Sequence, residues 1–202
     1  MKNLLAGLLL LVFVSSANAA IIDNGIYTTD STSGLDWLDL TETTNKSYNY
    51  VSTQFGIAGE FEGYRYATGL ELNGMIENYT GIDLTGIIAT SWSNDANIGG
   101  LVNLLGDNST TTGGGGWFYS RGMTADTYNS GSETRQVFAV LIDYVDLLRN
   151  DYTSSGTGIN FRDEMSSNMG SFLIRESVPE TSSFYLFTIS LLGLFGAARR
   201  KV

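Results

Sequence analysis

The residue types available for chemistry are restricted, because the sequence of 202 residues contains no cysteine and no histidine. Their absence excludes disulfides, thiol nucleophiles, Cys/His zinc sites and mechanisms in which an imidazole transfers a proton. A glycosidase would instead need two carboxyl groups at a defined separation. Asp36 and Asp39 have opposite parity in a strand, and Glu60 and Glu62 lie near a turn. We therefore expect no catalytic residues and a non-enzymatic protein, with a carboxylate-dependent glycan hydrolase as the alternative.

Aromatic residues make up 12% of the chain, and their rings are candidates for stacking on sugars. Trp92 and Trp117 lie beside polar or glycine-rich segments, so they are the first candidate glycan contacts. Tyr119 and Tyr128 are candidate supporting members of the same platform. Trp37 alternates with charged residues in a predicted strand and is expected to pack in the core.

Two further groups of residues are expected to be structural. Arg65 carries a planar guanidinium that can satisfy several acceptors, and we expect it to pair with Asp39 or Glu71. Thr68 and Glu71 have the spacing of a capping box, which predicts the start of a helix.

Oxygen-rich clusters are the only candidate metal ligands. Asp143, Asp146 and Asp151, and the run 107–109, have ligand types that suit calcium but lack the EF-hand spacing. We therefore predict no cofactor and no metal, with calcium as the exception to test, and a calcium-stabilised adhesion module as a third hypothesis. Residues 20–180 carry all 21 acidic residues and 7 of the 11 basic ones, a formal charge of −14, which argues against a nucleic-acid partner.

The elements that must position these residues follow from hydrophobic spacing and turn signals. Segments of alternating or continuous apolar residues predict strands, and apolar residues at helical spacing predict helices, one of them with Leu72, Met75, Ile76 and Tyr79 on one face. The predicted strands are 26–29, 35–40, 63–67, 117–123, 137–144 and 170–175, and the predicted helices are 47–55, one opening at Thr68, and one capped by Asp95. Glycine-rich turns connect them, and the class is α+β with antiparallel strands and two or three short helices.

The N-terminal residues have the layout of a secretory signal peptide. Lys2 is followed by the apolar run Leu4–Val14 and by a small-x-small site, Ala17 and Ala19. We expect cleavage after Ala19, with the Sec translocon and signal peptidase as partners and an exported product.

The C-terminal residues predict a transmembrane helix. Residues 181–198 carry no charge and are followed by a basic stop of Arg199, Arg200 and Lys201 within the tail 199–202. Basic flanks stay on the cytoplasmic side, so the rest of the chain is expected on the far side of the inner membrane.

The residues before this segment are Val178, Pro179 and Glu180, and Pro179 is the only proline in the chain. A short Pro-Glu motif, an apolar helix and a basic tail together resemble the PEP-CTERM sorting signal of Gram-negative bacteria. Thr181 stands where the family more often has a second proline. The resemblance implies that residues 178–202 are processed by exosortase, a membrane protease-transpeptidase. It also implies deposition at the cell surface or in an exopolysaccharide or biofilm matrix.

The region between the two ends also resembles known families. Residues 34–41, 47–48 and 63–71 are similar to the N-terminal part of a domain that recurs in PEP-CTERM proteins, and 170–175 to its last strand. The order of a tryptophan strand, a helix, Arg-x-x-Thr and a second helix resembles C-type-lectin-like domains related to formylglycine-generating enzymes. The expected organisation is a signal peptide at 1–19, one exported domain at 20–177 and the sorting signal at 178–202.

Overall fold

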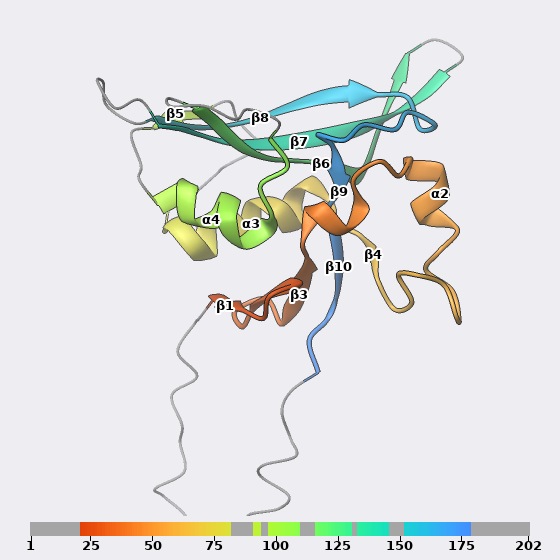
Figure 1. Cartoon of the computed structure of the whole chain (residues 1–202), viewed down its shortest axis with the longest axis horizontal. Coiled ribbons are helices and arrows are strands. Elements are labelled where there is room, and N and C mark those ends of the chain that lie inside the picture. Colours follow the sequence, from red (N-terminus) through yellow and green to blue (C-terminus); the bar gives the residue numbers. More distant parts are fainter. Residues whose placement is uncertain are drawn as a thin grey trace, which may run out of the picture.

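The computed structural model describes residues 21–81, 91–93, 97–109, 116–130, 133–145 and 152–178. These ranges form two sheets with helices between and beside them, so the predicted α+β class is confirmed (Figure 1). The elements are β1 Ile21–Asp23, β2 Tyr27–Asp30, β3 Leu35–Leu38, the 3₁₀ helix η2 Leu40–Thr43, α2 Tyr48–Ser52, β4 Arg65–Tyr66, α3 Gly69–Thr80, β5 Ser91–Ser93, α4 Asn97–Leu105, β6 Gly116–Ser130, β7 Glu133–Val145, β8 Tyr152–Asn160, β9 Gly170–Ser171 and β10 Leu173–Glu176.

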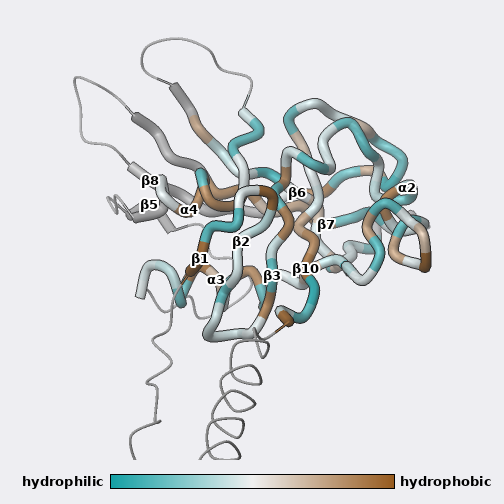
Figure 2. The backbone as a smooth tube through the Cα atoms, turned by 60° about the horizontal axis from the view of Figure 1, so that its bottom comes forward, coloured by the Kyte–Doolittle hydropathy of each residue, from teal (hydrophilic) through white to brown (hydrophobic). Residues whose placement is uncertain are grey.

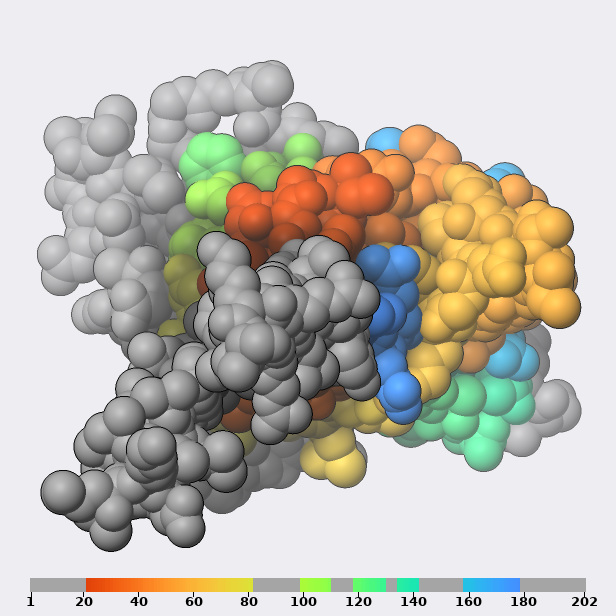
Figure 3. Space-filling model, turned by 90° about the horizontal axis from the view of Figure 1, so that it is seen from below, coloured from red at the N-terminus to blue at the C-terminus, as the bar shows by residue number. Residues whose placement is uncertain are grey.

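The first sheet joins the two ends of the described chain. Its order is β1-β2-β3-β10-β4, and every neighbouring pair is antiparallel. The last strand, β10, therefore lies between two strands from the first third of the chain, and Figure 3 shows its blue residues between red and yellow ones. The backbone N of Ser177 also donates to the carbonyl O of Gly34, at 2.9 Å. The first and last described residues, Ile21 and Val178, consequently both lie in or directly beside the first sheet.

The second sheet has the order β5-β8-β7-β6-β9 and contains the long β6–β7 hairpin. Helices α3 and α4 lie against one of its faces (Figure 1). Its β6–β9 pair is parallel, which departs from the predicted antiparallel arrangement. The two sheets meet at Phe172, whose N donates to the carbonyl O of Met123 at 2.9 Å and whose O accepts from the N of Ala67 at 2.8 Å.

The predicted capping box at the start of α3 is confirmed. The Thr68 side chain accepts from the backbone N of Glu71, and the Glu71 side chain accepts from the backbone N of Thr68. The helix ends at Gly81, whose φ of 73° is in the left-handed region that favours glycine. Local sequence alone therefore defines both ends of this helix.

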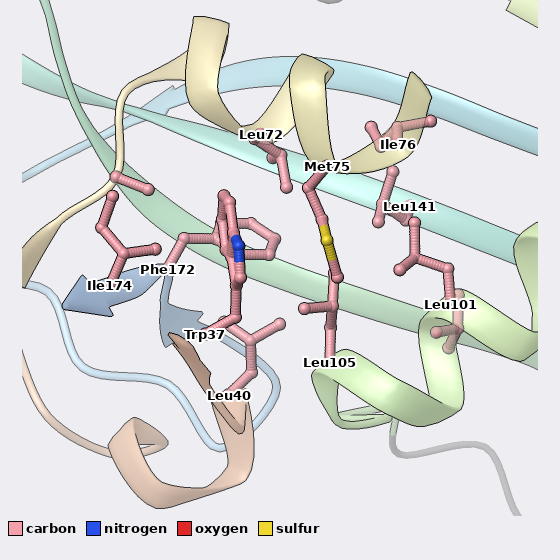
Figure 4. Close-up of a cluster of buried hydrophobic side chains, with 13 residues drawn as sticks. Trp37, Leu40, Leu72, Met75, Ile76, Leu101, Leu105, Leu141, Phe172 and Ile174 are labelled. Atoms are coloured by element: carbon pink, nitrogen blue, oxygen red, sulfur yellow. The ribbon is translucent and has the colours of Figure 1, made fainter. Parts of the chain in front are cut away.

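The main core lies where α3 and α4 pack between the two sheets (Figure 4). Trp37 is 1% exposed, as predicted for a core residue, and in Figure 4 its ring lies beside Phe172. Hydrophobic segments of α4, β6 and β10 converge in the middle of the molecule (Figure 2). The buried members of this core are Trp37, Leu40, Ala67, Leu72, Met75, Ile76, Leu101, Val102, Leu105, Ala139, Leu141, Phe172 and Ile174, and the predicted fourth apolar residue of α3, Tyr79, packs against them.

Several element boundaries differ from the sequence-based prediction. The strand predicted over 35–40 stops at Leu38, because Asp39 Oδ1 accepts from the backbone N of Thr41 at 2.8 Å and starts η2. Helix 47–55 is shorter, strand 63–67 is reduced to β4, and both hairpin strands are longer. Strands β1, β5 and β8 lie outside the predicted strands. Asp95, the predicted cap of α4, lies outside the described residues.

Candidate functional site

An irregularity in β6 sets the direction of the outer part of the β6–β7 hairpin. The register shifts between Met123 and Thr127, and the buried side chain of Gln136 fills this bulge. Its Nε2 donates to the carbonyl O of Thr124 and, at 2.6 Å, to the carbonyl O of Asp126. The bulge is thereby closed by hydrogen bonds from β7, which fixes the strand that continues beyond it.

An exposed group of side chains, here called the Tyr128–Phe161 patch, lies beyond this bulge and consists of Tyr128, Arg135, Ile159 and Phe161. Tyr128 is the register partner of Arg135, and the Arg135 Cζ lies 4.1 Å from the centroid of the Phe161 ring. Tyr128, Phe161 and Ile159 are 52%, 51% and 43% exposed. Three large apolar side chains thus remain in contact with solvent around one stacked guanidinium.

The patch contains one of the four predicted glycan contacts and three residues that sequence reasoning missed. Tyr128 is the predicted member, whereas Arg135, Ile159 and Phe161 were not singled out. The alternation of apolar residues at 159 and 161 was an available signal of a strand with one apolar face. The preceding Ser and Gly residues concealed it, because glycine is depleted in strands and both types are common in turns.

The other three predicted contacts belong to a different part of the same sheet. Trp92 of β5 and Tyr119 of β6 lie in one row of register partners that crosses β8 and β7. Trp117 lies two residues before Tyr119 on β6, so its position has the same parity. Tyr119 itself is half-buried. These three positions therefore lie on one face of the second sheet.

Tyr128 is not part of that row. Its register partner, Arg135, and the partner of Tyr119, Ile142, have opposite parity along β7. Successive residues of a strand face opposite sides of a sheet, so these two positions lie on opposite faces. The single aromatic platform expected from the sequence is divided into two.

The predicted ion pair of Arg65 is formed with Glu71 and joins β4 to the start of α3. Arg65 Nη2 lies 2.5 Å from Glu71 Oε1, and Nη1 lies 3.0 Å from Oε2. These hydrogen bonds lower the pKa of Glu71 from 4.5 to about 2, with further contributions from the backbone and hydroxyl of Thr68. The arrangement orients the helix and leaves the carboxylate occupied, as expected for a structural role.

The low pKa of Glu71 gives a prediction about acid stability. A folded-state pKa below the unfolded one contributes stability that is complete above about pH 4.5 and is lost as pH falls toward about 2. We expect Glu71→Gln to flatten the dependence of the urea midpoint on pH across this window, with little change in that slope above it. Glu77→Gln, in the last turns of the same helix, is the matched control. An unchanged slope in Glu71→Gln would contradict this assignment.

Asp36 and Asp39, considered as a catalytic pair, have separate structural roles. Asp36 is 5% exposed and its Oδ2 lies 3.1 Å from Arg175 Nε. That guanidinium lies between the rings of Tyr27 and Tyr64, at 5.0 and 4.8 Å from their centroids. Burial raises the pKa of Tyr64, an effect that Arg175 opposes. Asp36 thus connects β3 to β10, whereas Asp39 begins η2.

Glu60 and Glu62 are also bound by groups of this chain. Glu60 Oε1 lies 2.5 Å from Lys46 Nζ, and this hydrogen bond lowers the pKa of Glu60. Glu62 Oε2 accepts from the backbone N of Ala58 at 2.8 Å. Both carboxylates therefore stabilise the turn that follows α2.

The run 107–109, considered for calcium, fastens the end of α4 to β6. Asp107 Oδ1 accepts from the backbone N of Ser109 at 2.9 Å and of Tyr119 at 3.2 Å. Asn108 Nδ2 donates to the carbonyl O of Arg121 at 2.6 Å, and Asn108 Oδ1 accepts from the N of the same residue. These oxygens are used to hold a loop on a strand.

The second calcium candidate is only partly described. Asp143 lies in β7 as the register partner of Phe118, and Asp146 and Asp151 lie outside the described residues. Across the described ranges, no three Asp or Glu residues are grouped as metal ligands would be.

Most residues of the predicted terminal signals also lie outside the described ranges. These are Ala17 and Ala19, Pro179 and Glu180, and the basic stop. Val178 is described and is 86% exposed, directly after β10. In the described part of the chain no helix has the length and apolar character needed to cross a membrane, and the predicted span 181–198 falls outside it.

Comparison of the chain with protein-family models, with curated proteins and with solved structures finds no match.

Proposed function

We propose that this chain is an exported, exosortase-processed, non-enzymatic protein of the surface or extracellular matrix of a Gram-negative bacterium. The observation that carries this proposal is the order of features at the C-terminus. A Val-Pro-Glu motif at 178–180 precedes an uncharged apolar segment and a basic stop. The N-terminal pattern ending at Ala19 supports the same export route through the Sec translocon and signal peptidase.

The position of Val178 supports access to the motif by a membrane protease. The residue is 86% exposed, and the last strand before it is held in the first sheet. A processing enzyme would therefore meet Val178, the first residue of the motif, at the surface, and cleavage beyond the motif would leave β10 in place. The product would be an inner-membrane precursor first and a surface or matrix protein afterwards.

The absence of an enzymatic role is supported by how the candidate carboxylates are used. Asp36 and Glu60 form ion pairs, whereas Asp39 and Glu62 bind backbone N–H groups. We include a C-type-lectin-like fold in the same proposal, supported by the order of the Trp37 strand β3, α2, the Arg-x-x-Thr segment and α3.

The test is to express the full chain in its host with and without the exosortase gene and to measure the mass and location of the product. We expect loss of residues 1–19 in both strains, and removal of the C-terminal segment only where exosortase is present. The double variant Pro179→Ala, Glu180→Ala should stay uncut, whereas Glu176→Gln, an exposed change just before the motif, should be cut normally. A full-length cytoplasmic product in both strains contradicts the proposal.

A further inference from the structure

We propose that the Tyr128–Phe161 patch binds an uncharged polysaccharide chain, whose sugar rings stack on Tyr128 and Phe161. This inference rests on the proposed function and deepens it, because a matrix protein requires a surface that contacts the matrix polymer. The residues that would make this contact differ from the glycan contacts expected from the sequence, and Tyr128 is the residue that the two sets share.

The shape of the patch fits an extended polymer. Tyr128 and Phe161 belong to β6 and to the end of β8, with β7 between them. Two strand spacings separate them by roughly 10 Å, a length that covers more than one pyranose ring. Arg135 lies between the two aromatic residues, and its guanidinium is stacked on the Phe161 ring. The row therefore presents planar groups to a ligand that runs across the strands.

The chemistry of the patch also suits a sugar. Pyranose rings have apolar C–H faces that pack on aromatic rings, and their hydroxyl groups accept hydrogen bonds from a guanidinium. Ile159, beside Phe161, extends the apolar surface. Exposed aromatic and arginine side chains at one place are also the residue types that contribute most to binding surfaces.

The charge of the chain selects an uncharged ligand over an acidic one. Residues 20–180 have a formal charge of −14, so a polyanion would be repelled as it approached. Screening shortens the range of this repulsion to about 8 Å at physiological ionic strength but does not remove it at contact. Arg135 is the one charged residue of the patch. A single positive charge does not offset the repulsion between the acidic chain and a polyanion that extends beyond the patch.

The location of the patch allows binding while the chain is anchored. In Figure 1 the outer end of the β6–β7 hairpin lies on the opposite side of the molecule from β1 and the end of β10. Because the predicted membrane segment follows β10, the end of the hairpin that carries Tyr128 and Arg135 would lie on the side of the molecule remote from the membrane. Polymer binding would then be available before and after processing.

The experiment uses the full chain in a sugar-free detergent, in native gels that contain hydroxyethyl cellulose, galactomannan, dextran or the polyanion polygalacturonate. We expect retardation by at least one of the three neutral polymers and none by polygalacturonate. Tyr128→Ala and Phe161→Ala should each raise the dissociation constant about tenfold, and the double variant should abolish retardation. The matched control is Tyr50→Ala, which removes an aromatic side chain that is 44% exposed on α2 and should bind normally.

Each other outcome overturns the proposal. If no neutral polymer retards the chain, uncharged polysaccharides are excluded as ligands. Retardation by polygalacturonate would instead assign the patch to an acidic glycan. A concentration-dependent dimer that disappears in Tyr128→Ala would make the patch a contact between copies of this chain. Because the gels need no exosortase, failure of processing and failure of binding are distinguishable, and unchanged melting temperatures verify that the variants are folded.

Discussion

Replacing Trp37 with alanine is expected to lower the free energy of unfolding by about 3–5 kcal/mol, the range for removing a buried tryptophan. The side chain is 1% exposed and belongs to the core shared by both sheets. Its strand, β3, pairs with both β2 and β10, so the cavity would open between the N-terminal and C-terminal parts of the chain. Urea unfolding followed by far-UV circular dichroism measures the loss.

A second substitution separates packing from hydrogen bonding at the same place. The Nε1–H of Trp37 is buried and has no hydrogen-bond partner in the described structure. An unpaired buried donor costs roughly 1–3 kcal/mol, so Trp37→Phe loses volume but also removes this cost. We expect Trp37→Phe to retain more than half of the stability that Trp37→Ala loses. Equal losses in the two variants would show that the indole N–H contributes to folding after all.

The parts of the fold that could be predicted are those encoded in short stretches of sequence. The capping box of Thr68 and Glu71, the apolar face of α3 and the burial of Trp37 all follow from neighbouring residues, and all are confirmed. Glu71 was one of the two expected partners of Arg65, and its position in the first turn of α3 places it next to the guanidinium. In each case the interaction spans only a few residues or depends on strand parity.

The parts that could not be predicted depend on contacts between distant residues. Nothing local indicates that β10 lies between β3 and β4, because that order follows from how the chain closes on itself. The pairing of Tyr128 with Arg135 depends on the β6 bulge, which shifts the register by two residues and which Gln136 stabilises from the neighbouring strand. Phe161 was missed for the same reason, since its significance comes from Arg135 across the sheet.

Strand β9 lies very close to η2 at Gly170, and this contact leads to a second large effect. A Cβ on this residue would overlap the carbonyl O of Leu40 and lie 2.9 Å from Thr43 Oγ1. That hydroxyl also accepts from the backbone N of Ser171 at 2.7 Å, so movement of η2 would break a buried hydrogen bond. The obstructing atom is backbone, and it cannot move aside as a flexible side chain would.

We therefore expect Gly170→Ala to destabilise the protein by about 1–3 kcal/mol for overpacking, with a further loss of about 1 kcal/mol for the hydrogen bond of Ser171. The matched control is Gly74→Ala in α3, where an added Cβ meets nothing within 4 Å and helix propensity should raise stability by up to about 1 kcal/mol. Urea midpoints of the two alanine variants should thus move in opposite directions. A midpoint for Gly170→Ala at or above that of the unsubstituted chain would mean that β9 does not pack on η2 at this residue.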